Sequence, residues 1–350
     1  MNGLERSMAA LHMKEYDFVS PDPEIDLAYA AKLSGSLVGE CFIDHHKHAQ
    51  ALNAALNRHE VDGLYINLSL DTGSVSKKTD IEDGWRVIDT CGAEWIIGRN
   101  EIGAISKYPV QSLDAPLLYE AEPAMFGNYH VLDEIDARWL NEKMICCGLT
   151  GAFSQVVFLY GLENTLIAMI EEQEELERAI EARLKKAIKY AQTLSEHGAR
   201  FIWIGEGAAS SSVISPEQYE RFVLPYEKAL IKKIREELEI PVITHICGDI
   251  NKSIARIAQN GSNGLDIDYM VELNYARAQT NGTVCLKGNL NPAELLRFTP
   301  GQTYEACAEK IRAFRYANGL ILSTGCLVCR DTPPENIDAI VNACRDNKLS

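Results

Sequence analysis

The feature that most constrains the fold is an alternation of short apolar segments with helix-start signals in the second half of the chain. Short apolar runs without polar alternation are typical of parallel strands that are buried on both faces. Helical patterns separate these runs, which indicates repeated strand–loop–helix units and a parallel sheet. The predicted strands are Arg200–Gly205, Pro241–Cys247, Gly264–Asp268, Thr283–Gly288 and Gly319–Thr324.

Three helix starts in this region share one arrangement. Ser215–Gln218, Asn291–Glu294 and Thr332–Glu335 each offer a capping side chain, a proline at the first helical position and Gln or Glu at the third. The cap accepts from backbone N–H groups that lack a helical partner, and proline has no N–H to leave unpaired. Each of these segments is therefore predicted to open a helix after a strand.

The first half of the chain is less regular. Leu64–Leu70 and Met144–Leu149 are predicted strands, and Tyr16–Val19 is a weaker candidate for the first strand. Ala93–Val110 is predicted to form a hairpin-like excursion. Leu162–His197 is predicted to form two helices with a break near its acidic run.

Eight strands alternating with helices favour an α/β TIM (β/α)8 barrel with an insertion in the N-terminal half over a doubly wound sheet. A length of 350 residues is ordinary for such a barrel, and 46% hydrophobic residues supply a large core. Repeats, low-complexity tracts and long linkers are missing from the sequence, so residues 1–350 are predicted to form a single domain.

Composition also limits location and partners. No apolar run reaches the roughly 18 residues of a membrane-spanning helix, and residues 1–17 resemble a short amphipathic helix rather than a signal peptide. A cytoplasmic protein is therefore expected. The net charge is −16 and the basic residues are scattered, which argues against nucleic acid or an anionic membrane as partner. A folded protein partner and association into a homo-oligomer remain open.

The ten cysteines are expected to be reduced thiols, most of them in the core. Three residues stand apart because they occupy predicted C-terminal strand ends, where TIM barrels carry their reacting groups. His245 and Cys247 are two apart on one strand, so both side chains point to the same face, and Cys326 follows the last strand. One imidazole and two thiolates suit Zn²⁺, and three protein ligands leave a fourth position for chemistry.

Other polar residues have competing interpretations. Glu206 follows a strand and is a further ligand, a base near the metal, or a buried acid capping a loop. Cys326 and Cys329 form a C-x-x-C pair, for which a redox role is the less favoured hypothesis. The cluster DHHKH, containing His45 and His46, is expected to be spread over a helix surface, and a second metal site there is the less favoured reading.

Four long motifs occur in order between Arg200 and Ala343, and they resemble the uroporphyrinogen decarboxylase superfamily. Within it the chain resembles the methylcobalamin-dependent methyltransferase branch. The resemblance extends more loosely to the N-terminal ERSMAAL segment and to GLTGAFSQVVFLYGLENTLIAMIEE. The motifs are GEGAASSSVISPEQYERFVLPYEKALIKKI, PVITHICGDI, LKGNLNPAELL and GCLVCRDTPPENIDAIVNA.

The branch follows from differences at named positions. The Arg-rich N-terminal segment that binds substrate carboxylates in the decarboxylases has no counterpart here, and Gly325-Cys326 stands where they carry a G-H-G turn. The resemblance implies that His245, Cys247 and Cys326 hold zinc. The acid of the family's G-E-P turn falls on Glu206, with Gly207 replacing the proline.

The resemblance further implies methyl transfer between a corrinoid (cobalamin) carried by a partner corrinoid protein and a small-molecule donor or acceptor. A second family acid falls near Asp71 with altered spacing, and Gly288 and Asn289 are expected to contact substrate or corrinoid. A thiol such as coenzyme M, tetrahydrofolate, a methoxyarene, methanol or a methylamine all fit the small molecule. The alternatives are a uroporphyrinogen-type decarboxylase and a non-catalytic zinc-binding subunit of a methyltransferase complex.

Overall fold

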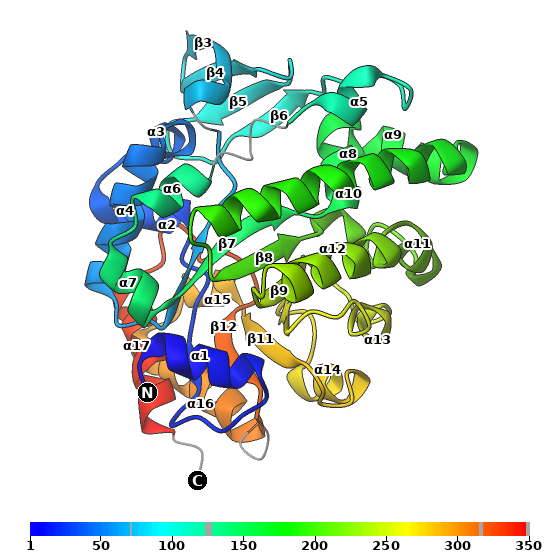
Figure 1. The fold of residues 1–350 in the computed structure, drawn as a ribbon. Helices are drawn as coiled ribbons and strands as arrows, with labels where there is room; N and C mark the ends of the chain where they lie inside the picture. Colours follow the sequence, from blue (N-terminus) through cyan, green and yellow to red (C-terminus); the bar gives the residue numbers. More distant parts are fainter. Residues whose placement is uncertain (71, 123–127, 315–317, 348–350) are drawn as a thin grey trace.

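The centre of the molecule is an eight-stranded parallel sheet curled into a nearly closed barrel, with helices around its outside (Figure 1). The computed structural model describes residues 1–70, 72–122, 128–314 and 318–347. The strand order is β1-β12-β11-β10-β9-β8-β7-β2, so the predicted TIM barrel is confirmed. The strands are β1 (Ser20–Pro21), β2 (Gly63–Ile66), β7 (Met144–Thr150), β8 (Phe201–Gly205), β9 (Val242–Ile246), β10 (Gly264–Ile267), β11 (Cys285–Leu290) and β12 (Leu320–Thr324).

The barrel closes between β1 and β2 through single backbone hydrogen bonds rather than a ladder. Asp62 N donates to Pro21 O at 2.8 Å, and Tyr65 N donates to Ile25 O at 3.3 Å. The first strand was predicted at Tyr16–Val19 but lies at Ser20–Pro21. That prediction was wrong because two residues, one of them a proline, carry no apolar pattern that a sequence argument can detect.

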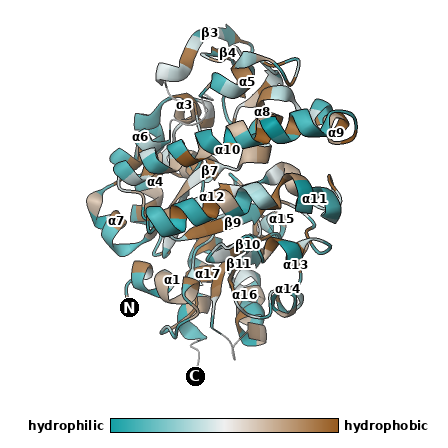
Figure 2. Cartoon of the chain, turned by 45° about the vertical axis from the view of Figure 1, so that its right-hand side comes forward, coloured by the Kyte–Doolittle hydropathy of each residue, from teal (hydrophilic) through white to brown (hydrophobic). Residues whose placement is uncertain are grey.

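The core lies inside the barrel and between the barrel and its helices. Every residue of β7, β11 and β12 is buried, as expected for parallel strands covered on both faces. Figure 2 shows hydrophobic strands behind helices such as α12, whose outward surface is largely hydrophilic. The helices on the first half of the barrel are α1 (Gly3–Leu11), α2 (Leu27–Ser34), α3 (Val38–Ile43), α4 (His45–Arg58), α5 (Pro116–Glu120), α6 (Tyr129–Asp133), α7 (Ala137–Glu142), α8 (Ala152–Tyr160) and α9 (Leu162–Glu171).

The helix starts follow the predicted capping chemistry at two of three positions. Ser215 and Gln218 form a reciprocal capping box, and Asn291 accepts from Ala293 N. At the third start the cap is Pro333, and the helix begins at Pro334, so the predicted Thr332 cap was wrong. The remaining helices are α10 (Gln173–Glu196), α11 (Pro216–Phe222), α12 (Leu224–Glu237), α13 (Ile254–Ile257), α14 (Leu273–Gln279), α15 (Pro292–Leu295), α16 (Pro300–Phe314) and α17 (Pro334–Asp346).

The insertion after β2 is a four-stranded antiparallel sheet, larger than the predicted hairpin at Ala93–Val110. It contains β3 (Val75–Ile81), β4 (Gly84–Asp89), β5 (Glu94–Gly98) and β6 (Ala104–Lys107). The prediction missed β3 because the inner residues of VSKKTDI are all exposed, so this edge strand shows no apolar alternation. Phe42 of α3 contacts Trp95 of β5, with ring centroids 6.0 Å apart, which fixes the sheet against the barrel's helices.

The predicted break in the long helical region is confirmed between α9 and α10, at Glu172. A sharper bend precedes it. Gly161 has a φ of +92°, and it turns the chain by 112° between α8 and α9. In the described part of the chain, no single helix is both long and apolar enough to cross a membrane. The two helices of this bent pair, taken together, have the length and the apolar composition of such a span.

Candidate metal centre

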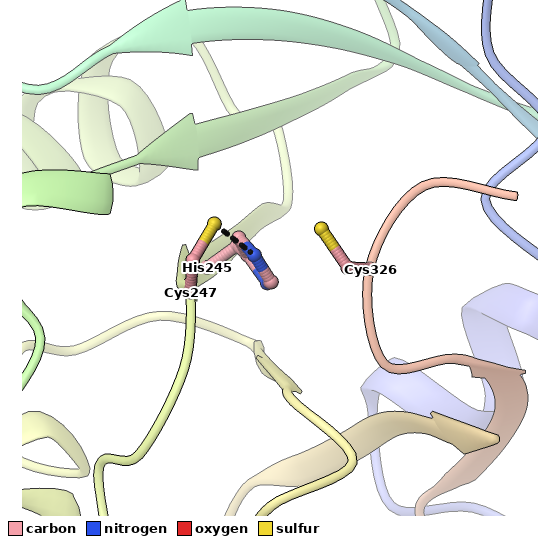
Figure 3. A group of neighbouring side chains, drawn as sticks. All are labelled: His245, Cys247 and Cys326. Carbon is pink, nitrogen blue, oxygen red and sulfur yellow. Dashed lines mark hydrogen bonds between the residues drawn. The ribbon is translucent and has the colours of Figure 1, made fainter. Parts of the chain in front are cut away.

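Three side chains from two strand ends converge at the mouth of the barrel. His245 is the fourth residue of β9, Cys247 follows that strand, and Cys326 lies two residues beyond β12. One ligand atom from each lies within 4.8 Å of the others, and Figure 3 shows the three side chains pointing toward a shared space. Since β10 and β11 separate β9 from β12 in the sheet, the curvature of the barrel brings Cys326 to the other two.

The imidazole of His245 is held in one orientation. Its Nδ1 lies 3.0 Å from the backbone oxygen of Asp266, and its ring stacks on Trp203 at a centroid distance of 4.9 Å. A donated Nδ1–H leaves the lone pair on Nε2, which faces Cys247 Sγ at 3.0 Å. A carbonyl oxygen that fixes the second ring nitrogen is typical of histidines that bind metals.

Two of these groups, His245 and Cys326, have raised pKa values. Burial alone would lower the pKa of His245, but Cys326, Glu24 and Asp266 outweigh it and raise that pKa to about 9. The hydrogen bond with Cys247, together with burial, raises the pKa of the Cys326 thiol well above its usual range. A metal entering this site would therefore displace protons, as ligand deprotonation requires.

The donor set fits zinc. A neutral imidazole and two thiols that can ionise match the nitrogen and sulfur ligands that Zn²⁺ accepts in tetrahedral sites. Cys247 is exposed and Cys326 is partly exposed, so solvent reaches both thiol-bearing side chains. His245 itself is 1% exposed.

A buried charged layer lies directly beneath His245, and the sequence interpretation did not anticipate it. Lys287 Nζ lies 3.1 Å from Glu24 Oε1, 3.0 Å from Asp266 Oδ2 and 2.9 Å from Ser323 Oγ. Trp203 Nε1 donates to the same Asp266 oxygen at 2.9 Å. The sequence did contain a signal for this layer: Asp266 in GLDID and Lys287 in VCLKG are charged residues inside otherwise apolar predicted strands.

Charge balance in this layer depends on Lys287. Burial raises the pKa of Glu24 well above its ordinary value, whereas Lys287 overcomes burial and lowers the pKa of Asp266. The pKa of the Lys287 ammonium is itself raised, since the neighbouring carboxylates outweigh its burial. The layer thus combines an ionised Asp266, which supports the His245 strand, with a Glu24 carboxyl that retains its proton more readily.

The candidate residue Glu206 follows β8 and is buried, and its contacts lead toward α8. Its Oε2 accepts from Ser154 N at 2.9 Å in the first turn of that helix. Burial, together with Glu227, raises the pKa of Glu206 to about 8. These contacts favour the buried capping acid among the three interpretations, and a catalytic role for Glu206 stays a prediction.

The other predicted site residues have separate positions. Asp71 lies outside the described residues. Asn289 is buried, donates to Asp268 O at 3.1 Å and accepts from Lys310 Nζ at 2.9 Å. It borders a pocket of about 210 Å³ beside the strand ends, whereas Gly288 lies in β11 with φ +136° and a backbone oxygen 2.6 Å from where a Cβ would stand.

The C-x-x-C pair is not joined by a bond in this structure, since Cys326 and Cys329 are both free cysteines. Cys329 Sγ lies 3.5 Å from Pro292 O, the geometry of a thiol donating to a carbonyl oxygen. It is absent from the ligand group that contains Cys326 among the described residues.

Comparisons with known proteins agree with this fold and give the family. Residues 88–347 match the family described as uroporphyrinogen decarboxylase (URO-D). The chain is 31% identical over 228 residues to a methylated-thiol–coenzyme M methyltransferase of Methanosarcina mazei, covering 65% of this chain and 59% of that protein. It is 30% identical over 159 residues to the methylcobamide:CoM methyltransferase MtbA of the same organism, covering 45% of each.

A solved structure described as a methyltransferase from Methanosarcina mazei shares the fold. It aligns with 99% of this chain and 98% of its own at a TM-score of 0.81 and 19% sequence identity. The aligned region spans about half of the length of the two curated methyltransferases. The likeness in structure therefore concerns the barrel as a whole, and the likeness in sequence concerns a part of it.

Proposed function

Since the chain belongs to the uroporphyrinogen decarboxylase (URO-D) family, we propose that it is a zinc-dependent methyltransferase acting between a corrinoid partner protein and a small thiol. The observation that carries the proposal is the convergence of His245, Cys247 and Cys326, of which the two cysteines are reached by solvent. A thiol of the coenzyme M kind is the preferred small molecule because both curated relatives are named for coenzyme M.

Zinc, when bound, lowers the pKa of a coordinated thiol and so supplies a thiolate near neutral pH. The protein itself would supply the three metal ligands and set their total charge. Two cysteine thiolates leave the bound sulfur electron-rich, and His245 presents its Nε2 because Nδ1 is occupied by the carbonyl of Asp266. A corrinoid carried by a partner protein would supply the methyl group to this thiolate and would keep the electron pair of the bond it gives up.

The charged layer acts on the ligand strand rather than on substrate. Lys287 neutralises Asp266, and Asp266 holds Trp203 through its indole N–H. Trp203 in turn stacks on His245 and limits rotation of the imidazole. We infer that Lys287, Asp266 and Trp203 are positioning residues for the metal ligand.

The test combines metal content with turnover. Purified wild type is expected to hold about one zinc in this site and to demethylate methylcobalamin with a thiol acceptor, followed by the absorbance change of the corrinoid. Cys326→Ala should lose both zinc and turnover. The matched control is Cys329→Ala, which removes a thiol from the same loop outside the ligand group and should retain both.

Three results would overturn the proposal. Full zinc retention in Cys326→Ala would exclude this residue as an essential ligand. An intact zinc site without turnover on any corrinoid substrate, across thiols, tetrahydrofolate and methoxyarenes, would favour a non-catalytic zinc-binding subunit. Decarboxylation of uroporphyrinogen without cobalamin-coupled turnover would favour the decarboxylase reading.

A further inference from the structure

A second group of metal-binding side chains lies on the outside of the barrel, where α4 meets α6. His45 and His46 form the first turn of α4, and Glu134 follows α6 directly. Ligand atoms of the three residues lie within 4.8 Å of one another. Glu134 Oε1 contacts His46 Nδ1 and lies 3.6 Å from His45 Nε2, so one carboxylate faces both imidazoles.

The backbone that carries Glu134 is fixed to α4 by a separate residue. Asn53 Nδ2 donates to Glu134 O at 2.9 Å, and Asn53 Oδ1 accepts from Asp136 N at 3.0 Å. Asn53 lies two turns along α4 from the histidines, so one helix holds both the imidazoles and the segment that brings the carboxylate. The three side chains are thus held together by tertiary structure rather than by sequence proximity.

Two further histidines extend the group toward α10. The ring of His130 lies 5.2 Å from that of His45 and 6.3 Å from that of His197, measured between centroids. His197 Nδ1 lies 2.8 Å from Asp133 Oδ1, which anchors the end of α6. Four of the eight histidines of the chain therefore gather on one face, from three segments distant in sequence.

We propose that His45, His46 and Glu134 bind a divalent transition-metal ion at a site separate from the His245 centre. Two imidazoles and one carboxylate form a ligand set of nitrogen and oxygen atoms, which suits divalent ions of intermediate softness. Zn²⁺ is such an ion and serves as the probe in the experiment below. The side chains are 19%, 64% and 33% exposed respectively, so water can complete the coordination. The ion would join α4 to the α6–α7 loop, and stabilise their packing.

The experiment measures zinc binding on the full chain without a histidine affinity tag. Calorimetric titration and elemental analysis should give two zinc ions for wild type and one for Cys247→Ser/Cys326→Ser. His46→Ala and Glu134→Gln should each weaken the remaining site by at least ~10-fold, because loss even of outer-shell partners has that effect. The matched control, His12→Ala, removes an exposed histidine elsewhere and should change neither stoichiometry nor affinity.

Cobalt separates the two sites by spectrum and does not depend on a folded cysteine variant. Co²⁺ bound by Cys247 and Cys326 gives a sulfur-to-metal charge-transfer band, whereas the second site contains no sulfur and adds only weak d–d absorption. A second Co²⁺ equivalent lost in His46→Ala, with the charge-transfer band retained, is the expected result. If the folded Cys247→Ser/Cys326→Ser variant takes up no zinc, or if His46→Ala leaves both the number and the affinity of bound zinc ions unchanged, the proposal is wrong, whatever the outcome at the His245 site.

Discussion

Replacement of Lys287 by methionine tests the buried charged layer most directly. The ammonium lies 3.1 Å from Glu24, 3.0 Å from Asp266 and 4.0 Å from Asp22, and all four side chains are at most 4% exposed. Methionine keeps the volume and removes the charge. Breaking a buried ion pair from one side costs about 3–5 kcal/mol because the remaining carboxylates stay uncompensated.

This loss corresponds to a measurable shift in melting temperature. For a chain of 350 residues, 1 kcal/mol lowers the Tm by roughly 1.4 °C, so Lys287→Met is expected to melt roughly 4–7 °C below wild type at pH 8. The assay is thermal unfolding followed by far-UV circular dichroism. Lys185→Met is the control, since this lysine is 74% exposed and its removal should change stability by less than about 0.5 kcal/mol.

The deficit should depend on pH in a defined direction. Burial already raises the pKa of Asp22 from 3.8 to about 7 with Lys287 present, and loss of the cation raises it further. At Asp22 the folded variant then binds more protons than the unfolded chain, so the contribution of this group to stability is greatest below pH 4 and is lost as pH rises toward and beyond 7. The deficit of Lys287→Met relative to wild type should therefore be smaller at pH 5 than at pH 8. Equal deficits at both pH values, or wild-type stability at pH 8, would refute the reasoning.

Two further substitutions have sharp expectations. Burial raises the pKa of Glu227 from 4.5 to about 7, so the contribution of this residue to stability is lost as pH rises through 7. Glu227→Gln should therefore narrow the difference in Tm between pH 5 and pH 8. An unchanged dependence of Tm on pH would contradict this. In Gly325→Ala the new Cβ would lie 2.2 Å from Tyr269 N, so the loop that carries Cys326 must move at a cost of about 1–3 kcal/mol. Zinc retention after dialysis should fall in this variant, and wild-type retention would show that the loop accommodates the methyl group.

The barrel was predictable because its strands are buried on both faces, and that environment leaves a direct mark in the sequence. In Met144–Leu149, for example, every residue is buried, and the run is accordingly apolar without polar alternation. β1 and β3 show no such apolar pattern, because β1 has only two residues and β3 is an exposed edge strand. The assignment of residues 1–350 to a single domain stays a prediction.

The site was predictable to the extent that it follows from strand ends. His245, Cys247 and Cys326 are of the right type at the ends where barrel chemistry occurs. The layer beneath them was not predictable as a unit, because Glu24, Asp266 and Lys287 come from three segments whose pairing depends on tertiary structure. For the same reason the sequence could not reveal that Glu134 meets the histidines of α4.

The stacking of Trp203 on His245 gives the protein an intrinsic optical reporter. Indole emission is quenched by a contacting imidazolium more strongly than by a neutral imidazole, so any ligand that displaces the His245 proton should brighten Trp203. Tyr65 covers this ring as well, at a centroid distance of 4.6 Å, and the chain has only three other tryptophans. The difference in emission between wild type and Trp203→Phe can therefore follow occupancy of the barrel mouth in real time, without a label and without turnover.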